Sequence, residues 1–189
     1  MHIGLYFGSF NPIHTGHLFV AEHVAAHTDV DKVWFVVSPH NPLKDSASLL
    51  NEYDRLHLVE LAIADNDNFR ASNIEFSLPK PSYTVDTLAY LSEKFPLETF
   101  TLIMGGDAFQ NIRRWKNWET LVRRHAIIVY NRPGFEVEAL TGGNITFLDA
   151  PSVHLSASYI RKEIKARRST RYLLPEPVRE YVEANRYFL

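Results

Sequence analysis

The amino-acid sequence predicts an α/β fold, namely a Rossmann-like open parallel sheet with flanking helices and a helical C-terminal segment. Short apolar runs recur along the chain and are mostly continuous rather than alternating, which is typical of strands buried on both faces of a sheet. Segments with helical spacing of apolar residues separate these runs. This repeated strand-then-helix order favours a parallel sheet with right-handed crossovers. A length of 189 residues fits a single domain over 1–189, with the helical segment at about 151–189.

Apolar, β-rich runs mark the candidate strands, which are Ile3–Phe7, Val33–Val37, Phe100–Met104, Ala126–Tyr130 and Ile145–Leu148. Helices are expected where apolar residues recur every three or four positions. Their apolar faces span Leu18–Ala25, Leu56–Ile63, Leu88–Phe95 and Trp118–Val122. Two more helices are expected in the tail, at about 158–168 and 176–185. Pro175 and Pro177 suit the start of the second, where a missing N–H costs nothing.

The composition excludes several classes of protein. The chain has no cysteine, which rules out a disulfide scaffold, a Cys-ligated metal site and a cysteine nucleophile. Lys and Arg total 20 against 22 Asp and Glu, so no basic field favours binding to nucleic acid or to an anionic membrane. No apolar run approaches the ~20 residues that span a bilayer, and the N-terminus lacks the features of a signal peptide. We therefore expect a soluble, cytoplasmic protein.

The most informative stretch, Gly8–His17 with the sequence GSFNPIHTGH, lies between the first expected strand and the first expected helix. In an open parallel sheet, ligands bind at the carboxyl ends of strands. Free N–H groups at a helix start favour anions there, and phosphate above all. Gly8 permits a tight turn, and Gly16 permits a close backbone approach. His14 and His17, three positions apart near a helix start, can face the same point and donate to phosphate oxygens.

Two other interpretations compete with phosphate binding at this loop. The histidines could be ordinary surface residues in a polar turn. They could also be a metal-binding pair, but the stretch has no Cys, Asp or Glu to complete a ligand set. Phosphate binding alone explains the glycines, the helix start and both histidines together. The stretch also resembles the signature G-x-F-x-P-x-H-x-G-H of the HxGH nucleotidylyltransferase superfamily.

A second candidate anion site begins the first tail helix, with the sequence LSASYIR at Leu155–Arg161. Hydroxyls and amides at a helix start, followed by Arg161 one turn later, can hold an anion. An ordinary capped helix with a solvated basic face is the alternative, and the run alone favours it. The run resembles the superfamily's ISSTxIR-like element, which favours the phosphate role once it is paired with the N-terminal loop. Ala157 departs from that element, which usually has a second Ser there.

The middle of the chain is similar to bacterial nicotinate-nucleotide adenylyltransferases. The matching elements are PSYTVDTL from Pro81, GGD at Gly105–Asp107, Trp115, RPG from Arg132 and the segment PEPV from Pro175. They follow one another in the family's order over nearly the whole chain. The resemblance implies transfer of an adenylyl group from ATP to nicotinate mononucleotide, which gives deamido-NAD and pyrophosphate. It also implies that Mg²⁺ arrives with ATP and that no protein side chain needs to bind it.

Each middle element also has a physical interpretation of its own. Asp107, after a strand, can accept hydrogen bonds from ribose hydroxyls, or it can be a helix N-cap. Trp115 has polar neighbours in the sequence and can stack on a pyridinium ring, or it can belong to the core. Tyr83 and Thr84 precede a helix whose N–H groups can receive a carboxylate, although capping is the alternative for Thr84. Trp118 is expected in the core.

The segment after the second expected strand offers Lys44 for the phosphates, by similarity to the family's PxxPPHK element. His40 precedes Lys44 by four positions rather than one, and we assign it no role. Arg55 matches a family arginine, and a salt-bridged structural role beside Glu52 and Asp54 fits equally well.

Taken together, the resemblance implies three sets of site residues. The catalytic set is His14, His17, Lys44 and Arg161. The ATP-binding set is Gly8, Ser9, Phe10, His14, His17, Gly105, Asp107, Ser156, Ser158, Ile160 and Arg161. The set for nicotinate mononucleotide is Ser9, Phe10, Lys44, Tyr83, Thr84, Asp107, Trp115 and Arg132.

The alternatives for function are another HxGH enzyme, of the pantetheine-phosphate type, and a non-catalytic nucleotide-binding module. The first would lack the combination of PSYT, GGD and RPG, and the second would lose one phosphate signature, whereas this sequence has all of them. A homo-oligomer is a further expectation, because an exposed tail helix could pair with a second copy. The preference for the nicotinate over the nicotinamide form is left open.

Overall fold

The computed structural model describes residues 1–39, 49–131, 140, 142–149, 151 and 154–189. Its centre is an all-parallel sheet with the strand order β3-β2-β1-β4-β5-β6. The strands are β1 (His2–Gly8), β2 (Lys32–Val37), β3 (Phe69–Ser72), β4 (Thr99–Gly105), β5 (Ala126–Tyr130) and β6 (Ile145–Leu148). The order reverses direction at β1 and β4, so the switch point of the sheet lies between these two strands. The expected Rossmann-like parallel sheet is confirmed.

The sheet contains one strand that the sequence did not predict. β3 has the sequence FRAS and pairs with β2, with Val33 opposite Phe69 and Val36 opposite Ser72. The segment is short and contains the charged Arg70, so it lacks the apolar run that marks the other strands. At this edge position Arg70 is exposed and places its guanidinium 4.5 Å from the ring of Trp34. The cross-strand contact, rather than the local sequence, explains why this segment is a strand.

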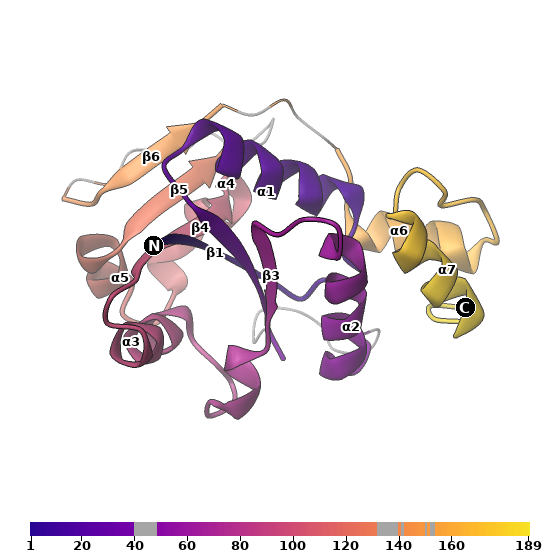
Figure 1. The fold of residues 1–189 in the computed structure, drawn as a ribbon, viewed down its shortest axis with the longest axis horizontal. Helices are drawn as coiled ribbons and strands as arrows, with labels where there is room; N and C mark the ends of the chain where they lie inside the picture. Colours follow the sequence, from indigo (N-terminus) through magenta and orange to yellow (C-terminus); the bar gives the residue numbers. More distant parts are fainter. Residues whose placement is uncertain (40–48, 132–139, 141, 150, 152–153) are drawn as a thin grey trace.

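Helices cover both faces of the sheet (Figure 1). They are α1 (Thr15–His27), α2 (Glu52–Ile63), α3 (Thr84–Lys94), α4 (Gly106–Gln110), α5 (Trp118–Arg124), α6 (Ala157–Lys165) and α7 (Glu176–Ala184), with 3-10 turns η1 (Ile74–Ser77) and η2 (Ile112–Arg114). The expected helices are all found. The first tail helix ends at Lys165, three residues before the expected end, and α4 is an additional short helix.

Alternate residues of the central strands enter two separate core clusters. Phe35 of β2 packs with residues of α1, α2, α6 and α7, whereas Trp34 packs with residues of α3, α4 and α5. Ile3 and Leu5 of β1 belong to the second cluster, and Tyr6 belongs to the first. A strand that is buried on both faces has apolar residues at successive positions, which explains the continuous runs in the sequence.

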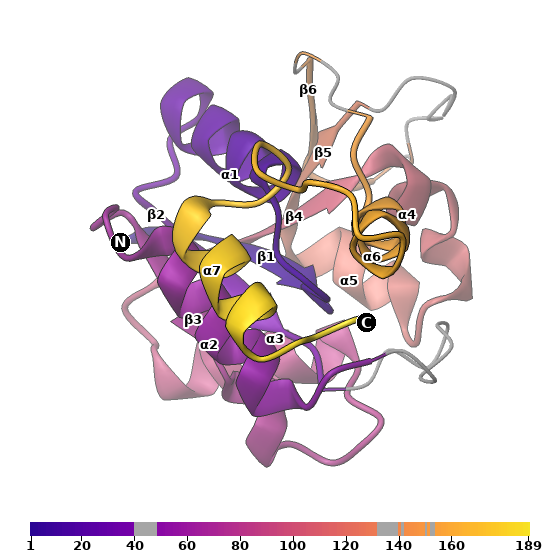
Figure 2. The same cartoon turned by 90° about the vertical axis from the view of Figure 1, so that its right-hand side faces the viewer.

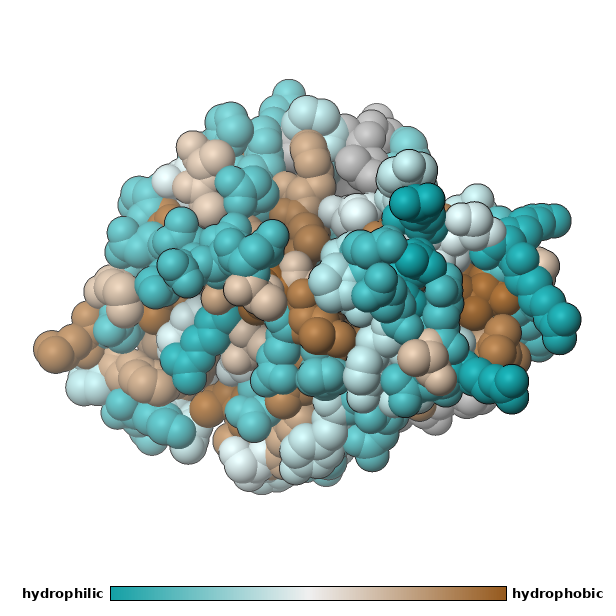
Figure 3. Space-filling model, turned by 45° about the vertical axis from the view of Figure 1, so that its right-hand side comes forward, coloured by the Kyte–Doolittle hydropathy of each residue, from teal (hydrophilic) through white to brown (hydrophobic). Residues whose placement is uncertain are grey.

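The tail helices lie at one end of the molecule, beyond α2 (Figures 1 and 2). α7 contacts α2, and its buried Val178 and Val182 join the same core cluster as Leu58 of α2. Pro175 is the N-cap residue of α7 and Pro177 is in its first turn, as the sequence predicted. On the face shown in Figure 3, hydrophobic residues form small separate groups among hydrophilic ones. Across the described ranges, no helix has both the length and the apolar character that a membrane span needs.

Candidate active site

The loop that follows β1 is folded tightly against the end of that strand. A Cβ atom on Gly8 would lie 2.8 Å from the ring of Phe10, so only glycine allows this contact. Phe10 has a φ of 45°, and its side chain is 2% exposed within the core. Any contact of Phe10 with a ligand would therefore involve its backbone. The Ser9 carbonyl accepts a hydrogen bond of 2.6 Å from Arg55, which fixes the backbone of this turn.

The two histidines of the loop lie at the start of α1 with their rings stacked. His14 is the N-cap residue and His17 is the third residue of the helix. The ring centroids are 3.7 Å apart, and the backbone N–H of His14 donates to Nδ1 of His17 over 3.2 Å. Because Nδ1 of His17 accepts this hydrogen bond, the neutral ring carries its proton on Nε2, which is then a donor. His14 is 3% exposed, so the interpretation as a surface histidine is wrong.

Gly16 allows His14 to lie against the helix. A Cβ atom at position 16 would be 3.1 Å from Nδ1 of His14 and 3.5 Å from the Cβ of Leu155. The missing side chain thus makes room both for the imidazole and for the segment that leads into α6. Packing therefore favours glycine at this position, in addition to any close approach of a ligand to the backbone.

The second phosphate signature lies directly beside the first. Arg161, in α6, donates to the carbonyl of Asn11 over 2.9 Å and to the Ser158 hydroxyl over 3.2 Å. Burial lowers the pKa of the Arg161 guanidinium from its ordinary value, but the group stays charged at neutral pH. The structure therefore brings together the N-terminal loop and α6, while phosphate binding by these residues stays a prediction.

The other predicted residues of α6 have roles within the helix. Ser156 is the N-cap, and its hydroxyl accepts from the Tyr159 N–H over 3.2 Å, so the capping interpretation is confirmed for this residue. Ile160 is fully buried, and its N–H donates to the Ser156 carbonyl. Ala157 is the first residue of the helix, where the family usually has a second Ser. Contacts of Ser156, Ser158 and Ile160 with ATP stay predictions.

Asp107 lies where β4 turns into α4. Gly105 is the N-cap residue and Asp107 is in the first turn, so the N-cap alternative for Asp107 is wrong. A Cβ atom on Gly105 would lie 2.5 Å from Oδ1 of Asp107 and 3.0 Å from the hydroxyl of Tyr130. An acidic side chain in the first turn of a helix is stabilised by the helix dipole. The carboxylate is therefore held above the end of β4, beside the switch point of the sheet.

The start of α3 and the segment around Trp115 are linked by side chains. Lys116 donates to Asp86 of α3 over 2.7 Å, and its Nζ lies 4.7 Å from the ring centre of Tyr83. Tyr83 is the N-cap residue, and among the described residues its side chain gives no capping hydrogen bond. Trp115 is half-buried and packs on the second core cluster, as does Trp118. One part of the Trp115 side chain thus packs on the core, and another part stays accessible to solvent.

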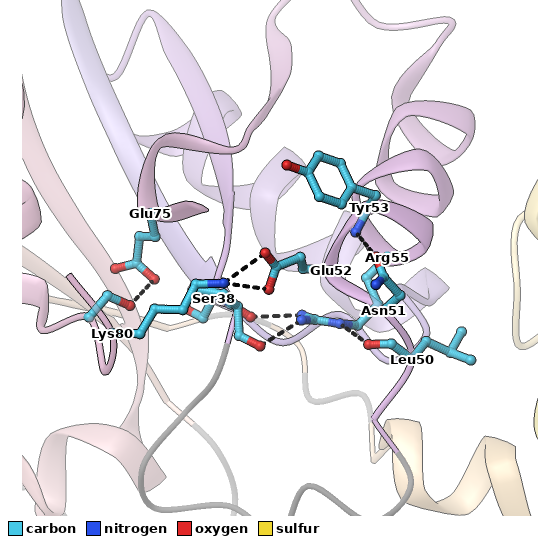
Figure 4. Close-up of polar contacts among 10 residues, drawn as sticks. Ser38, Leu50, Asn51, Glu52, Tyr53, Arg55, Glu75 and Lys80 are labelled. Carbon is cyan, nitrogen blue, oxygen red and sulfur yellow. Dashed lines mark hydrogen bonds and ion pairs between the residues drawn. The ribbon is translucent and has the colours of Figure 1, made fainter. Parts of the chain in front are cut away.

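Arg55 is a buried arginine whose partners among the described residues are backbone carbonyls rather than carboxylates. It is 0% exposed and donates four hydrogen bonds of 2.6–3.0 Å. The acceptors are the backbone carbonyl oxygens of Ser9, Ser38, Pro39 and Leu50. Figure 4 shows its guanidinium directed from α2 toward Ser38 and Leu50. Glu52 pairs with Lys80 instead, over 2.8 Å. Burial lowers the pKa of Arg55 to about 10, while the charge of Glu52 opposes this shift.

Lys44, Arg132 and His40 lie outside the described residues, so the predictions for them are unchanged. Sequence reasoning also missed a buried carboxylate. Glu75 of η1 is 2% exposed and accepts hydrogen bonds from Ser82 over 2.9 Å and from Thr87 over 2.8 Å. The serine and threonine belong to the PSYTVDT element, but nothing local marks Glu75 as their partner.

Comparison with known proteins shows which family and which solved structures this chain resembles. The model of the cytidylyltransferase-like family matches residues 5–163. A protein of Cytophaga hutchinsonii named "Probable nicotinate-nucleotide adenylyltransferase" is 49% identical over 100% of this chain and 98% of its own length. A Flavobacterium psychrophilum protein of the same name is 46% identical over 100% of this chain and 99% of its own.

A solved structure has the same fold at low sequence identity. It is the Plasmodium falciparum nicotinic acid mononucleotide adenylyltransferase complexed with NaAD, with a TM-score of 0.85 and 21% identity over 99% of this chain and 97% of that one. The full-length identity to the curated relatives and the family model, together with the two adjoining phosphate signatures, place this chain in the nicotinate-nucleotide adenylyltransferase family.

Proposed function

We propose that this protein transfers the adenylyl group of ATP to nicotinate mononucleotide and releases pyrophosphate. The observation that carries the proposal is the hydrogen bond between Arg161 and the Asn11 carbonyl. It joins the histidine loop and the start of α6 into one anion-binding surface at the carboxyl end of β1, where nucleotides bind in this type of sheet. The names of the full-length relatives support the same reaction.

The chemistry requires positioning and charge neutralisation rather than a general base. An oxygen of the mononucleotide phosphate is already an anion, and it attacks the α-phosphorus of ATP. As this P–O bond forms, the bond between the α-phosphorus and the bridging oxygen breaks, and pyrophosphate leaves with the electron pair. Donors held in place before the reaction stabilise the charge that grows on the leaving group.

In this proposal His17 donates from Nε2 to the ATP phosphates, and Arg161 supplies a fixed positive charge. His14 completes the donor set from its place at the start of α1, and Lys44 adds a second cation. Mg²⁺ that arrives with ATP would supply further charge neutralisation to the polyphosphate, and in this proposal no protein side chain holds it.

The mononucleotide would bind on the side of α3 and Trp115. The first N–H groups of α3, at Thr84 and the following residue, would receive the nicotinate carboxylate. The half-buried Trp115 would stack on the pyridinium ring, an interaction worth about 0.5–2 kcal/mol. Asp107, beside the switch point, would accept hydrogen bonds from ribose hydroxyls, and Tyr83 and Arg132 would complete this side. A cytoplasmic location and a homo-oligomer stay predictions.

Pyrophosphate release from MgATP tests the proposal directly. Nicotinate mononucleotide, nicotinamide mononucleotide and phosphopantetheine would be compared as acceptors. Turnover with the nicotinate form and much slower turnover with its amide would support both the reaction and recognition of the carboxylate. Turnover only with phosphopantetheine would identify a different HxGH enzyme. Binding of ATP without turnover of any acceptor would indicate a non-catalytic nucleotide-binding module and overturn the proposal.

A further inference from the structure

Glu75 is a buried acid that the proposed mechanism does not use. It lies in the 3-10 turn η1 and is 2% exposed, and its hydrogen-bond donors among the described residues are hydroxyl groups. Ser82 donates to its Oε2 over 2.9 Å, and Thr87 donates to its Oε1 over 2.8 Å. The nearby Ser38 hydroxyl also favours the charged form of this carboxyl and so lowers its pKa. Burial of a carboxylate is costly unless hydrogen bonds compensate, so such a group needs an explanation.

The hydroxyl partners of Glu75 lie on both sides of the helix start that the proposal assigns to the mononucleotide. Ser82 immediately precedes the N-cap residue Tyr83, and Thr87 is the fourth residue of α3. The hydroxyl of Thr87 is also 3.2 Å from the Tyr83 carbonyl. One carboxylate therefore holds the loop before α3 and the first turn of α3 at the same time, and so sets the direction of the first N–H groups of the helix.

Ser38, near Glu75, connects this helix start with the phosphate side. Ser38 follows β2, and its N–H donates to the Gly8 carbonyl over 2.9 Å. Its own carbonyl accepts from Arg55 (Figure 4). Arg55 also donates to the carbonyl of Ser9. Contacts thus lead from the start of α3 through Glu75 and the nearby Ser38 to the loop that contains the histidines.

We propose that Glu75 is a positioning residue that sets the start of α3 at a defined place relative to the phosphate loop, and thereby aligns the mononucleotide for attack on ATP. The inference rests on the proposed function. It assigns Glu75 no contact with either substrate. A shift of the start of α3 would weaken binding of the mononucleotide while the histidine loop and Arg161 keep their own contacts, so the two substrates should respond differently.

The test is steady-state kinetics of Glu75→Gln with each substrate varied in turn. The glutamine has nearly the same volume, but its amide nitrogen is a donor, so one of the hydroxyls loses its acceptor. The KM for nicotinate mononucleotide should rise about tenfold, as expected for one hydrogen bond to a charged group. The KM for ATP should change less than about twofold. Glu93→Gln, the same change at an exposed position of α3, is the matched control and should leave both constants unchanged.

A second measurement keeps the test independent of folding. Ser82→Ala and Thr87→Val remove the partners one at a time, and each should raise the same KM. Combined with Glu75→Gln, their effects should be less than additive, because the variants remove the same hydrogen bonds. Equal changes in both KM values, additive effects or no change would overturn the role of Glu75. A wild-type protein that does not turn over nicotinate mononucleotide would instead overturn the proposed function.

Discussion

The two sides of the candidate site are held in different ways. On the phosphate side, the His14 ring is 3% exposed and lies against the helix start, where the missing side chain of Gly16 makes room for it. On the mononucleotide side, Trp115 is half-buried and Lys116 reaches Asp86 from an exposed position. The phosphate side is fixed by close packing, whereas the contacts of Trp115 and Lys116 on the other side are open to solvent. Substitutions should therefore affect the first more strongly.

The largest loss of activity is expected for His17→Ala. It removes a donor held by the His14 N–H while leaving the buried core in place. Removal of one such donor lowers kcat by about 10²–10³-fold in comparable sites. His23→Ala, on the same helix and also half-buried, is the control, and it should keep kcat within about twofold. Melting curves must show both variants folded, and equal kcat values for the two variants would contradict the assignment.

The largest loss of stability is expected for Arg55→Ala. The substitution leaves carbonyls of three loop segments without their buried donor and opens a cavity. We expect the free energy of unfolding to fall by about 3 kcal/mol or more, measured by urea denaturation. Arg123→Ala, which breaks only an exposed pair with Glu119, should cost less than about 1 kcal/mol. Similar costs for both arginines would show that the carbonyl contacts are unimportant.

Gly16→Ala separates activity from stability on the phosphate side. The new methyl group would meet Nδ1 of His14 at 3.1 Å, so the imidazole must shift by a few tenths of an ångström. We expect kcat to fall about tenfold, since a misplaced catalytic donor is costly. The melting temperature should stay close to that of the wild type, because alanine favours the helix. A variant with unchanged kcat would show that the site tolerates movement of His14.

A smaller effect is expected for Lys116→Met on the mononucleotide side. The change removes the ion pair with Asp86 and the contact with the Tyr83 ring, both of them exposed to solvent. Exposed contacts of this kind are weak, so the KM for nicotinate mononucleotide should rise only about two- to threefold. The KM for ATP should not change. An effect as large as that of His17→Ala would show that the two sides are equally constrained.

The smallest effect is a pH dependence of stability from Glu75. Burial raises the pKa of this carboxyl above its ordinary value of 4.5, and the hydroxyls of Thr87, Ser82 and Ser38 oppose the shift. The folded state therefore binds the proton more tightly than the unfolded state, and stability falls as the pH rises from about 4.5 through the folded pKa. Relative to Glu75→Gln, the wild type should gain stability as the pH falls toward 4.5. Urea denaturation at several pH values measures this difference, and a constant difference would contradict the shift.

Sequence reasoning found the elements whose signals are local. The histidine loop, the start of α3 and the cap of α6 each depend on residues within one turn of one another. The strand β3 was missed, since FRAS becomes a strand only by pairing with β2. The helix α4 was missed because its five residues give no helical period. For Arg55 the sequence allowed two interpretations. Its partners are backbone carbonyls, whose positions depend on the fold and not on the residue types.

The sequence by itself determined the order of the strands and helices other than β3 and α4, the glycines at the phosphate loop and the family to which the chain belongs. These features follow from spacing along the chain, where periodicity and turn chemistry act over a few residues. Only the tertiary structure decided that Arg161 contacts Asn11, 150 positions away, and that Glu75 holds the start of α3. Such pairs form when folding brings the carboxyl ends of the parallel strands to one edge of the sheet. Buried polar groups there must find partners wherever the fold provides them.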